Sequence, residues 1–117
     1  MEGEIPKNLG QNRNLDILDL SNNKLFGEIP KAVFSSNKLS NLSLGSNSLG
    51  KLIPKELTKL RYLKVLNLFG NKFDTIEDGN FPNKYSYFNL GANYLSKEEL
   101  QKLDVEAGHL YLSDQFV

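Results

Sequence analysis

The sequence of 117 residues contains no cysteine. This absence excludes disulfide bonds, thiolate metal sites and a thiol nucleophile. Long apolar runs are also missing, because none approaches the roughly 18 residues that a membrane-spanning helix requires. The first residues, MEGEIPKN, lack the basic and then apolar pattern of a signal peptide. We therefore expect no membrane insertion by this segment.

Charge of one sign does not predominate, because 14 basic residues balance 14 acidic ones. No block of like charge interrupts this balance. Nucleic acids and anionic membrane surfaces attract strongly basic proteins, so we expect neither as a partner. A chain of this length fits one domain, and we assign residues 1–117 to it.

One pattern recurs along the whole chain. Leu18, Leu42 and Leu66 are spaced by 24 residues, and Phe88 and Leu110 follow at steps of 22. The full copies are LDILDLSNNKL, LSNLSLGSNSL, LKVLNLFGNKF and YSYFNLGANYL, beginning at Leu15, Leu39, Leu63 and Tyr85. The chain therefore contains four full units and a partial fifth, and a fixed period of this length is typical of a solenoid.

The shared pattern LxxLxLxxNxL resembles the leucine-rich repeat. GEIP at 3–6 and 27–30, and KLIP at 51–54, resemble the LxGxIP element of the plant-type subfamily, known chiefly from receptor ectodomains and polygalacturonase-inhibiting proteins. The resemblance implies an α/β solenoid whose parallel sheet lines the concave face, and a protein or peptide ligand. It also implies an extracellular protein, although this chain shows no signal peptide.

The leucine spacing has a physical reason. In LxL the two leucines of a short strand point to one side and the residue between them points to the other, so each unit contributes one buried and one open face. We expect strands near 17–20, 41–44, 65–68, 87–90 and 109–112. The resemblance further implies a ladder in which the asparagine amides of successive units bond to the backbone of adjacent turns.

Two segments depart from the repeat. TIEDGNFPNK has lost the Gly-x-Ile-Pro form, so we expect an irregular connection there. SKEELQKL begins with Ser96 and has Glu99 three residues later, which is a capping box, and we predict a short helix at 97–103.

The ends of the array show no capping unit, although solenoids need caps with a polar outer face. The sequence opens inside a Gly-x-Ile-Pro element and stops at Phe116 and Val117, still in register. We consider three explanations: a fragment of a longer array, a makeshift cap formed by the last half-unit and helix, and cover by another chain. The third includes end-to-end self-association through the termini.

Groups for catalysis or metal binding are sparse. His109 is the one histidine, and we interpret it as an ordinary strand residue because no serine, cysteine or second histidine is placed to cooperate with it. Asp16 and Asp19 lack the ligand count that calcium requires. No phosphate-binding glycine motif is present. We therefore predict no enzyme activity, cofactor or metal.

Three lysines follow the Ile-Pro steps and should form a column on the outer side of the solenoid. They are Lys7, Lys31 and Lys55. Their acidic neighbours Glu4, Glu28 and Glu56 dilute the charge, so we interpret this column as a solvated surface.

The open face of the concave sheet is the candidate binding surface, because its side chains are free of packing. The candidate residues are Ile17, Asp19, Asn41, Ser43, Val65, Asn67, Phe69, Tyr87, Asn89, His109 and Tyr111. Phe69, Tyr87 and Tyr111 gather in the C-terminal half, and exposed aromatic residues beside small ones are typical of interface hot spots. Equally, these side chains could simply cover the sheet.

Asn41 also begins the sequon Asn41-Leu42-Ser43, which makes it a candidate glycosylation acceptor on the open face. A glycan there would leave the aromatic half as the binding region.

Our first hypothesis for function is a non-enzymatic module that binds a protein or peptide on the concave face. The alternative is a structural segment of a larger assembly or longer array whose neighbours cover the ends. A third hypothesis is carbohydrate or ice-surface binding on the flat columns of asparagine and serine.

Overall fold

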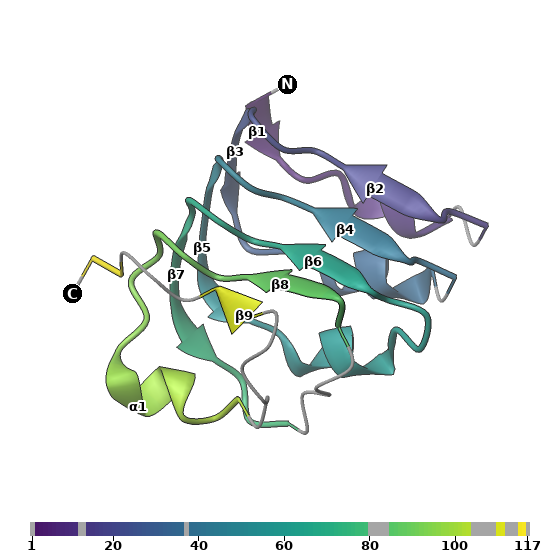
Figure 1. Ribbon diagram of the computed structural model, residues 1–117. Coiled ribbons are helices and arrows are strands. Elements are labelled where there is room, and N and C mark those ends of the chain that lie inside the picture. Colours follow the sequence, from purple (N-terminus) through teal and green to yellow (C-terminus); the bar gives the residue numbers. More distant parts are fainter. Residues whose placement is uncertain are drawn as a thin grey trace.

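The computed structural model describes residues 2–11, 14–36, 38–79, 85–103, 110–111 and 115–116. The chain winds into stacked turns that form a short α/β solenoid (Figure 1). A five-stranded parallel sheet, in the order β2-β4-β6-β8-β9, lines one side, and a four-stranded parallel sheet, β1-β3-β5-β7, forms a second side. No helix in these described ranges has the length and hydropathy to cross a membrane.

The five-stranded sheet, which we call the concave sheet, confirms the predicted register. Its strands are β2 (Ile17–Asp19), β4 (Asn41–Ser43), β6 (Val65–Asn67), β8 (Tyr87–Asn89) and β9 (Leu110–Tyr111). Leu18 lies opposite Leu42, Leu42 opposite Leu66, Leu66 opposite Phe88, and Phe88 opposite Leu110. The change of step from 24 to 22 residues therefore leaves the strands aligned.

The four-stranded sheet, which we call the outer sheet, was not predicted from the sequence. It contains β1 (Glu2–Glu4), β3 (Lys24–Gly27), β5 (Ser48–Ile53) and β7 (Lys72–Ile76). The pairing of β5 with β7 shifts by one residue between Lys51 and Leu52, so that Leu52 faces Thr75. The residue left over by this bulge is Asp74, directly before the segment TIEDGNFPNK, for which we expected an irregular connection. Residues 80–84 of that segment lie outside the described residues.

A 3-10 helix follows each Ile-Pro step. These helices are η1 (Lys7–Gln11), η2 (Lys31–Ser35) and η3 (Lys55–Lys59). Pro30 and Pro54 precede two of them in extended conformation, with φ of −65° and −79°. Proline fixes φ near these values and has no N–H to leave unpaired, so it suits the point where the chain enters a tight turn.

The core consists of aliphatic and aromatic rungs that shield one another from water. In the third unit, Leu63, Leu66, Leu68, Phe73 and Ile76 are all at most 1% exposed. Each fully buried side chain of this size contributes about 1.5–3 kcal/mol relative to leaving it exposed. Because each rung needs neighbours above and below to be covered, the units stabilise one another and form one continuous core.

Further along the core, the ring of Tyr85 packs edge-on against that of Phe88, with centroids 5.0 Å apart. Burial of the Tyr85 hydroxyl raises its pKa to about 12, since the charged form loses solvation.

The asparagine ladder joins adjacent units through the backbone. Asn71 donates from Nδ2 to the Leu44 carbonyl oxygen at 2.9 Å and accepts from the Leu49 N–H at 3.0 Å. Asn47 and Asn93 make the corresponding bonds one unit before and one unit after. Each asparagine amide therefore donates to a carbonyl oxygen of the preceding unit. It also accepts the N–H of the residue two positions after the preceding unit's asparagine, so two backbone groups of that unit are satisfied.

Gln115 takes the next position of the ladder. Its Oε1 accepts from the Leu95 N–H at 2.9 Å, and its Nε2 donates to the Leu90 carbonyl oxygen at 2.7 Å. Gln115 follows Asn93 by 22 residues, the same step that separates Phe88 from Leu110, so the repeat register extends to it.

The predicted short helix is α1 (Lys97–Leu100), and turn bonds continue it to Leu103. Ser96 caps it by accepting from the Glu99 N–H at 3.3 Å. The Glu99 carboxylate accepts from the Ile76 N–H at 2.7 Å, and Lys102 Nζ donates to the Ile76 carbonyl oxygen at 3.0 Å. Two side chains thus occupy the backbone groups of the last residue of β7, an edge strand that would otherwise be open to pairing.

Candidate interaction face

The open side of the concave sheet carries the predicted candidate residues in two columns. One column contains Ile17, Asn41, Val65 and Tyr87, which lie opposite one another across the strands. The second contains Asp19, Ser43, Asn67, Asn89 and Tyr111. Ile17 is 60% exposed and Asp19 is also exposed, whereas the members of both columns from Asn41 to Asn89 are half-buried.

The second column supports the backbone where the chain leaves each strand. Asp19, Asn67 and Asn89 each accept, through Oδ1, the N–H of the residue two positions later, at 3.0, 3.0 and 2.9 Å. Asp19 also accepts from the Ser21 hydroxyl at 2.6 Å. These two bonds, the hydroxyl first, hold the pKa of Asp19 below its ordinary value. A conformational role for these residues was not predicted from the sequence.

Phe69 lies between two glycines at the exit of β6. The Phe69 carbonyl oxygen accepts from the Ser46 N–H at 2.7 Å, and the Gly91 carbonyl oxygen accepts from the Gly70 N–H at 3.0 Å. The same bond therefore recurs from unit to unit, and Gly45, Phe69 and Gly91 occupy equivalent positions in three successive units. A Cβ placed at Gly45 would approach the Phe69 carbonyl oxygen to 3.3 Å. With no side chain on either neighbour, the Phe69 ring remains 39% exposed.

Tyr87 is fixed on the same face. Its hydroxyl oxygen accepts from Asn89 Nδ2 at 2.9 Å, while Asn89 Oδ1 holds the Gly91 N–H. Asn89 therefore orients the tyrosine and the strand exit together. Phe69 and Tyr87 form the described part of the aromatic region that the sequence predicted.

Asn41, the candidate glycosylation acceptor, lies in the middle of the sheet between Ile17 and Val65. Its side chain is half-buried, and its Oδ1 is buried without a hydrogen-bond partner among the described residues. Glycosylation at Asn41 stays a prediction.

Two predicted residues are only partly described or not described. His109 lies outside the described residues, and for Tyr111 the structure describes the backbone in β9 and not the side chain. No group of three potential metal-ligating side chains occurs in the part of the chain that the structure describes.

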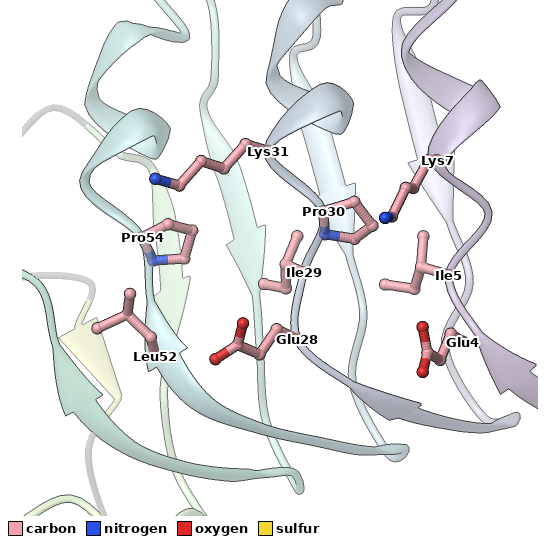
Figure 2. A pocket seen from close by; sticks show the side chains of 9 residues that line it. All are labelled: Glu4, Ile5, Lys7, Glu28, Ile29, Pro30, Lys31, Leu52 and Pro54. Carbon is pink, nitrogen blue, oxygen red and sulfur yellow. The ribbon is translucent and has the colours of Figure 1, made fainter.

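The outer side of the solenoid contains a groove that the sequence analysis did not identify as a site (Figure 2). This outer groove has a volume of about 420 Å³. Its lining residues come from the Ile-Pro steps of three successive units, and they are Glu4, Ile5, Lys7, Glu28, Ile29, Pro30, Lys31, Leu52 and Pro54. The repeated segments GEIPK at 3–7 and 27–31 were the sequence signal for it.

A family model described as leucine rich repeat matches residues 13–73. No curated protein sequence matches the chain. The structure of a TDR receptor is 28% identical, covers 98% of this chain and 21% of its own, and has a TM-score of 0.81. The Arabidopsis receptor kinase HAESA, solved with the peptide hormone IDA and the co-receptor SERK1, is 29% identical, with 91% and 19% covered and a TM-score of 0.71.

A plant ice-binding protein is 24% identical, with 80% of this chain and 39% of its own covered and a TM-score of 0.64. This last likeness shows the fold alone. The chain spans about a fifth of the length of the two receptor chains.

Proposed function

The chain belongs to the leucine-rich repeat family, and we propose that it is a non-enzymatic module that binds an extended peptide segment of a protein partner on the concave sheet. The observation that carries this proposal is the pair of aromatic side chains on the open face: Phe69 is 39% exposed between two glycines, and Tyr87 is held by Asn89.

The chemistry of this region favours a peptide over a small molecule. Phe69 and Tyr87 offer flat apolar surface at a low cost in side-chain entropy. Gly45 and Gly91 are buried and carry no side chain, so neither covers the Phe69 ring with a side chain of its own. Parallel strands are spaced by about 4.8 Å, so an extended segment crossing them would meet one residue of each column per strand.

The solved relatives support the same class of ligand. The HAESA structure contains a peptide hormone and a co-receptor, and it covers most of this chain at 29% identity. We extend that to this chain only as a class, a protein or peptide partner, because the matched region is about a fifth of that receptor chain.

The proposal can be tested with a displayed library of random linear peptides selected on the purified protein. Enriched peptides would be synthesised and their dissociation constants measured on wild type and on the variants Phe69→Ala and Tyr87→Ala. Each substitution should weaken binding by about 2 kcal/mol, roughly 30-fold, without unfolding the chain.

Phe26→Ala is the matched control, because Phe26 is 52% exposed but belongs to β3 of the outer sheet. Peptides whose affinity depends on Phe26 and not on Phe69 or Tyr87 would overturn the proposal. A Tyr87→Ala variant that loses its far-ultraviolet circular dichroism would instead place Tyr87 in the core and remove it from the binding surface.

End-to-end association is the second candidate, and Ile17 favours it. Ile17 is 60% exposed on β2, the edge strand of the concave sheet, whereas Val65 in the same column is half-buried. Contact with another chain at this edge would cover Ile17. Ile17→Lys should then abolish self-association measured by sedimentation, and association that survives this substitution would exclude the β2 edge as the contact.

A further inference from the structure

The outer groove carries two parallel rows of opposite charge. Figure 2 shows Glu4 and Glu28 along one side and Lys7 and Lys31 along the other, with isoleucine and proline side chains between the rows. The same order, Glu-Ile-Pro-Lys, repeats in the first two units, so the rows run along the stacking direction of the solenoid.

These charges do not neutralise one another within a unit. Among the described residues no salt bridge joins Glu4 to Lys7 or Glu28 to Lys31. Ile5 and Ile29, at 2% and 5% exposed, form an apolar floor between the rows. Opposite charges that are exposed and held apart can each interact with a complementary group on another molecule.

One cation is already partly engaged. Lys31 Nζ lies 3.6 Å from Glu56 Oε2, and the Lys31 side chain is still 67% exposed. In the third unit Leu52 stands where Glu28 stands in the second, so the acidic row ends there. The double row is therefore confined to the first two units.

We propose that this outer groove is the contact for a second copy of the chain, related by a two-fold axis parallel to the rows. Rotation about such an axis turns the face over and exchanges left for right. The acidic row of one copy then meets the basic row of the other, unit against unit. Lys7 faces Glu4 of the second copy, and Lys31 faces Glu28 of the second copy.

Repulsion between like charges excludes the second way of relating two copies by a two-fold axis in the plane of the contact. A two-fold axis across the rows brings acidic row against acidic row and basic against basic, which is repulsive. An isologous contact requires a patch that is complementary to itself, and two adjacent rows of opposite charge meet that requirement in one orientation only. The two solenoids therefore lie side by side with their turns stacked in the same direction.

The association is weak and depends on salt. Stable interfaces bury about 1,200–2,000 Å², which a groove over two units does not provide. Exposed ion pairs each contribute little and are screened by salt. Phe26 is 52% exposed and in register with Glu4, but it is not among the residues that line the groove. We expect dimers at high protein concentration that dissociate as the salt concentration rises.

Charge exchange between two variants tests the proposal. Lys7→Glu with Lys31→Glu gives a wholly acidic groove, and Glu4→Lys with Glu28→Lys gives a wholly basic one. Sedimentation equilibrium should show wild-type mass rising with concentration, with a dissociation constant about tenfold or more larger at 0.5 M than at 0.05 M salt. Each variant alone should remain a single chain, and an equimolar mixture should form heterodimers.

Two single substitutions repeat the test without changing Lys31, whose replacement by glutamate would also place a second carboxylate beside Glu56. The single substitutions Lys7→Glu and Glu4→Lys leave the Lys31–Glu56 contact intact and should show the same loss and the same recovery on mixing, with smaller amplitude. Circular dichroism confirms that each variant is folded.

The outcomes separate this contact from the others. A wild type that stays a single chain at the highest concentration, or a mixture of folded variants that fails to associate, overturns the proposal. Association that Ile17→Lys abolishes, and that the charge variants leave unchanged, assigns the contact to the β2 edge and overturns it as well. Peptide binding is measured at Phe69 and Tyr87, which do not line the outer groove, so its outcome is separate from that of the charge variants.

Discussion

Replacement of Asn71 by alanine tests the asparagine ladder at a buried polar link between successive units. Asn71 is 4% exposed, donates to the Leu44 carbonyl oxygen at 2.9 Å and accepts from the Leu49 N–H at 3.0 Å. Leu49 itself is fully buried. Alanine would remove both bonds and leave a space that is too enclosed for free exchange with solvent.

The loss in the free energy of unfolding depends on which backbone groups are left without any hydrogen-bond partner in Asn71→Ala. The three carbonyl oxygens that accept from Asn71 each keep a second donor: Asn47 for Leu44, Asn93 for Leu68 and Ser46 for Phe69. The Leu49 N–H is the group left without its acceptor. An orphaned buried donor costs about 1–3 kcal/mol, and the lost bond to Leu44 adds about 1 kcal/mol. We expect the free energy of unfolding to fall by about 2–4 kcal/mol in total.

Urea denaturation followed by circular dichroism measures this loss, with Asn23→Ala as the matched control. Asn23 holds the same position in the first unit, is half-exposed, and donates to the Leu20 and Ser21 carbonyl oxygens at 2.9 and 3.1 Å. Water can replace part of what its amide supplies, so we expect a loss of about 1 kcal/mol or less. Equal losses for the two alanine variants would refute the ladder as a source of stability between units.

Asn71→Asp sharpens the test. The carboxylate keeps an acceptor for the Leu49 N–H but sets a charged oxygen against the Leu44 carbonyl oxygen, and burial raises the pKa of such a carboxyl above its unfolded value. A raised folded pKa means that the folded state binds the proton more tightly, so stability increases as the pH falls through that pKa. The variant should be less stable than Asn71→Ala at pH 7 and should recover toward it in acid.

Three further substitutions test other parts of the structure. The pKa of Glu99 lies below its ordinary value of 4.5, because the Ile76 N–H and then Lys102 favour the carboxylate. The stabilisation that Glu99 provides is present above that ordinary value and is lost as the pH falls through the lower folded pKa. In Glu99→Gln the urea midpoint should therefore depend less on pH between about pH 3 and 6 than in wild type. An unchanged dependence of the midpoint on pH would contradict this. Gly70→Ala, at φ of +71°, should cost about 1–2 kcal/mol in thermal unfolding, and no change would show that the turn relaxes. Phe73→Ala, at 0% exposure, should cost about 3–5 kcal/mol in urea unfolding, and a loss below 1 kcal/mol would mean that the core closes around the gap.

The concave sheet could be predicted because its signal is local. Leu42 and Leu44 enclose one outward residue, Ser43, and the same spacing recurs in every unit, so both the strand and its register follow from the side-chain alternation. Gln115 could be placed in the ladder for the same reason, although it differs from asparagine by one methylene.

The outer sheet could not be predicted because its cause is not local. Strand β5 contains Gly50 and also Lys51, whose φ of +66° is unusual for a residue with a side chain. Such residues favour a turn, yet the stacking of the units brings β3, β5 and β7 side by side and their backbones pair. The pairing of tertiary neighbours overrides local preference here.

The hydrogen bonds of the open face were also beyond the sequence. The repeat predicts that Asn89 points outward, but it does not predict which acceptor or donor its amide selects. In the structure Asn89 bonds to the Tyr87 hydroxyl and to the Gly91 N–H. Likewise, Glu99 was predicted to face back onto its own helix in a capping box, and its carboxylate accepts from Ile76 and Lys102. Contacts of this kind depend on which segment the fold brings near.

The column that contains Asp19, Asn67 and Asn89 and the aromatic pair Phe69 and Tyr87 therefore differ in what a ligand can use. Asp19, Asn67 and Asn89 already accept a backbone N–H at each strand exit, so a partner that took over these oxygens would leave that N–H unsatisfied. A flat polar ligand such as a sugar chain or ice would have to compete for these groups. Phe69 and Tyr87 present apolar ring surface that no such backbone bond claims. The selectivity of the proposed peptide site should therefore reside in these aromatic residues, and the polar column should fix the shape of the strands on which they are displayed.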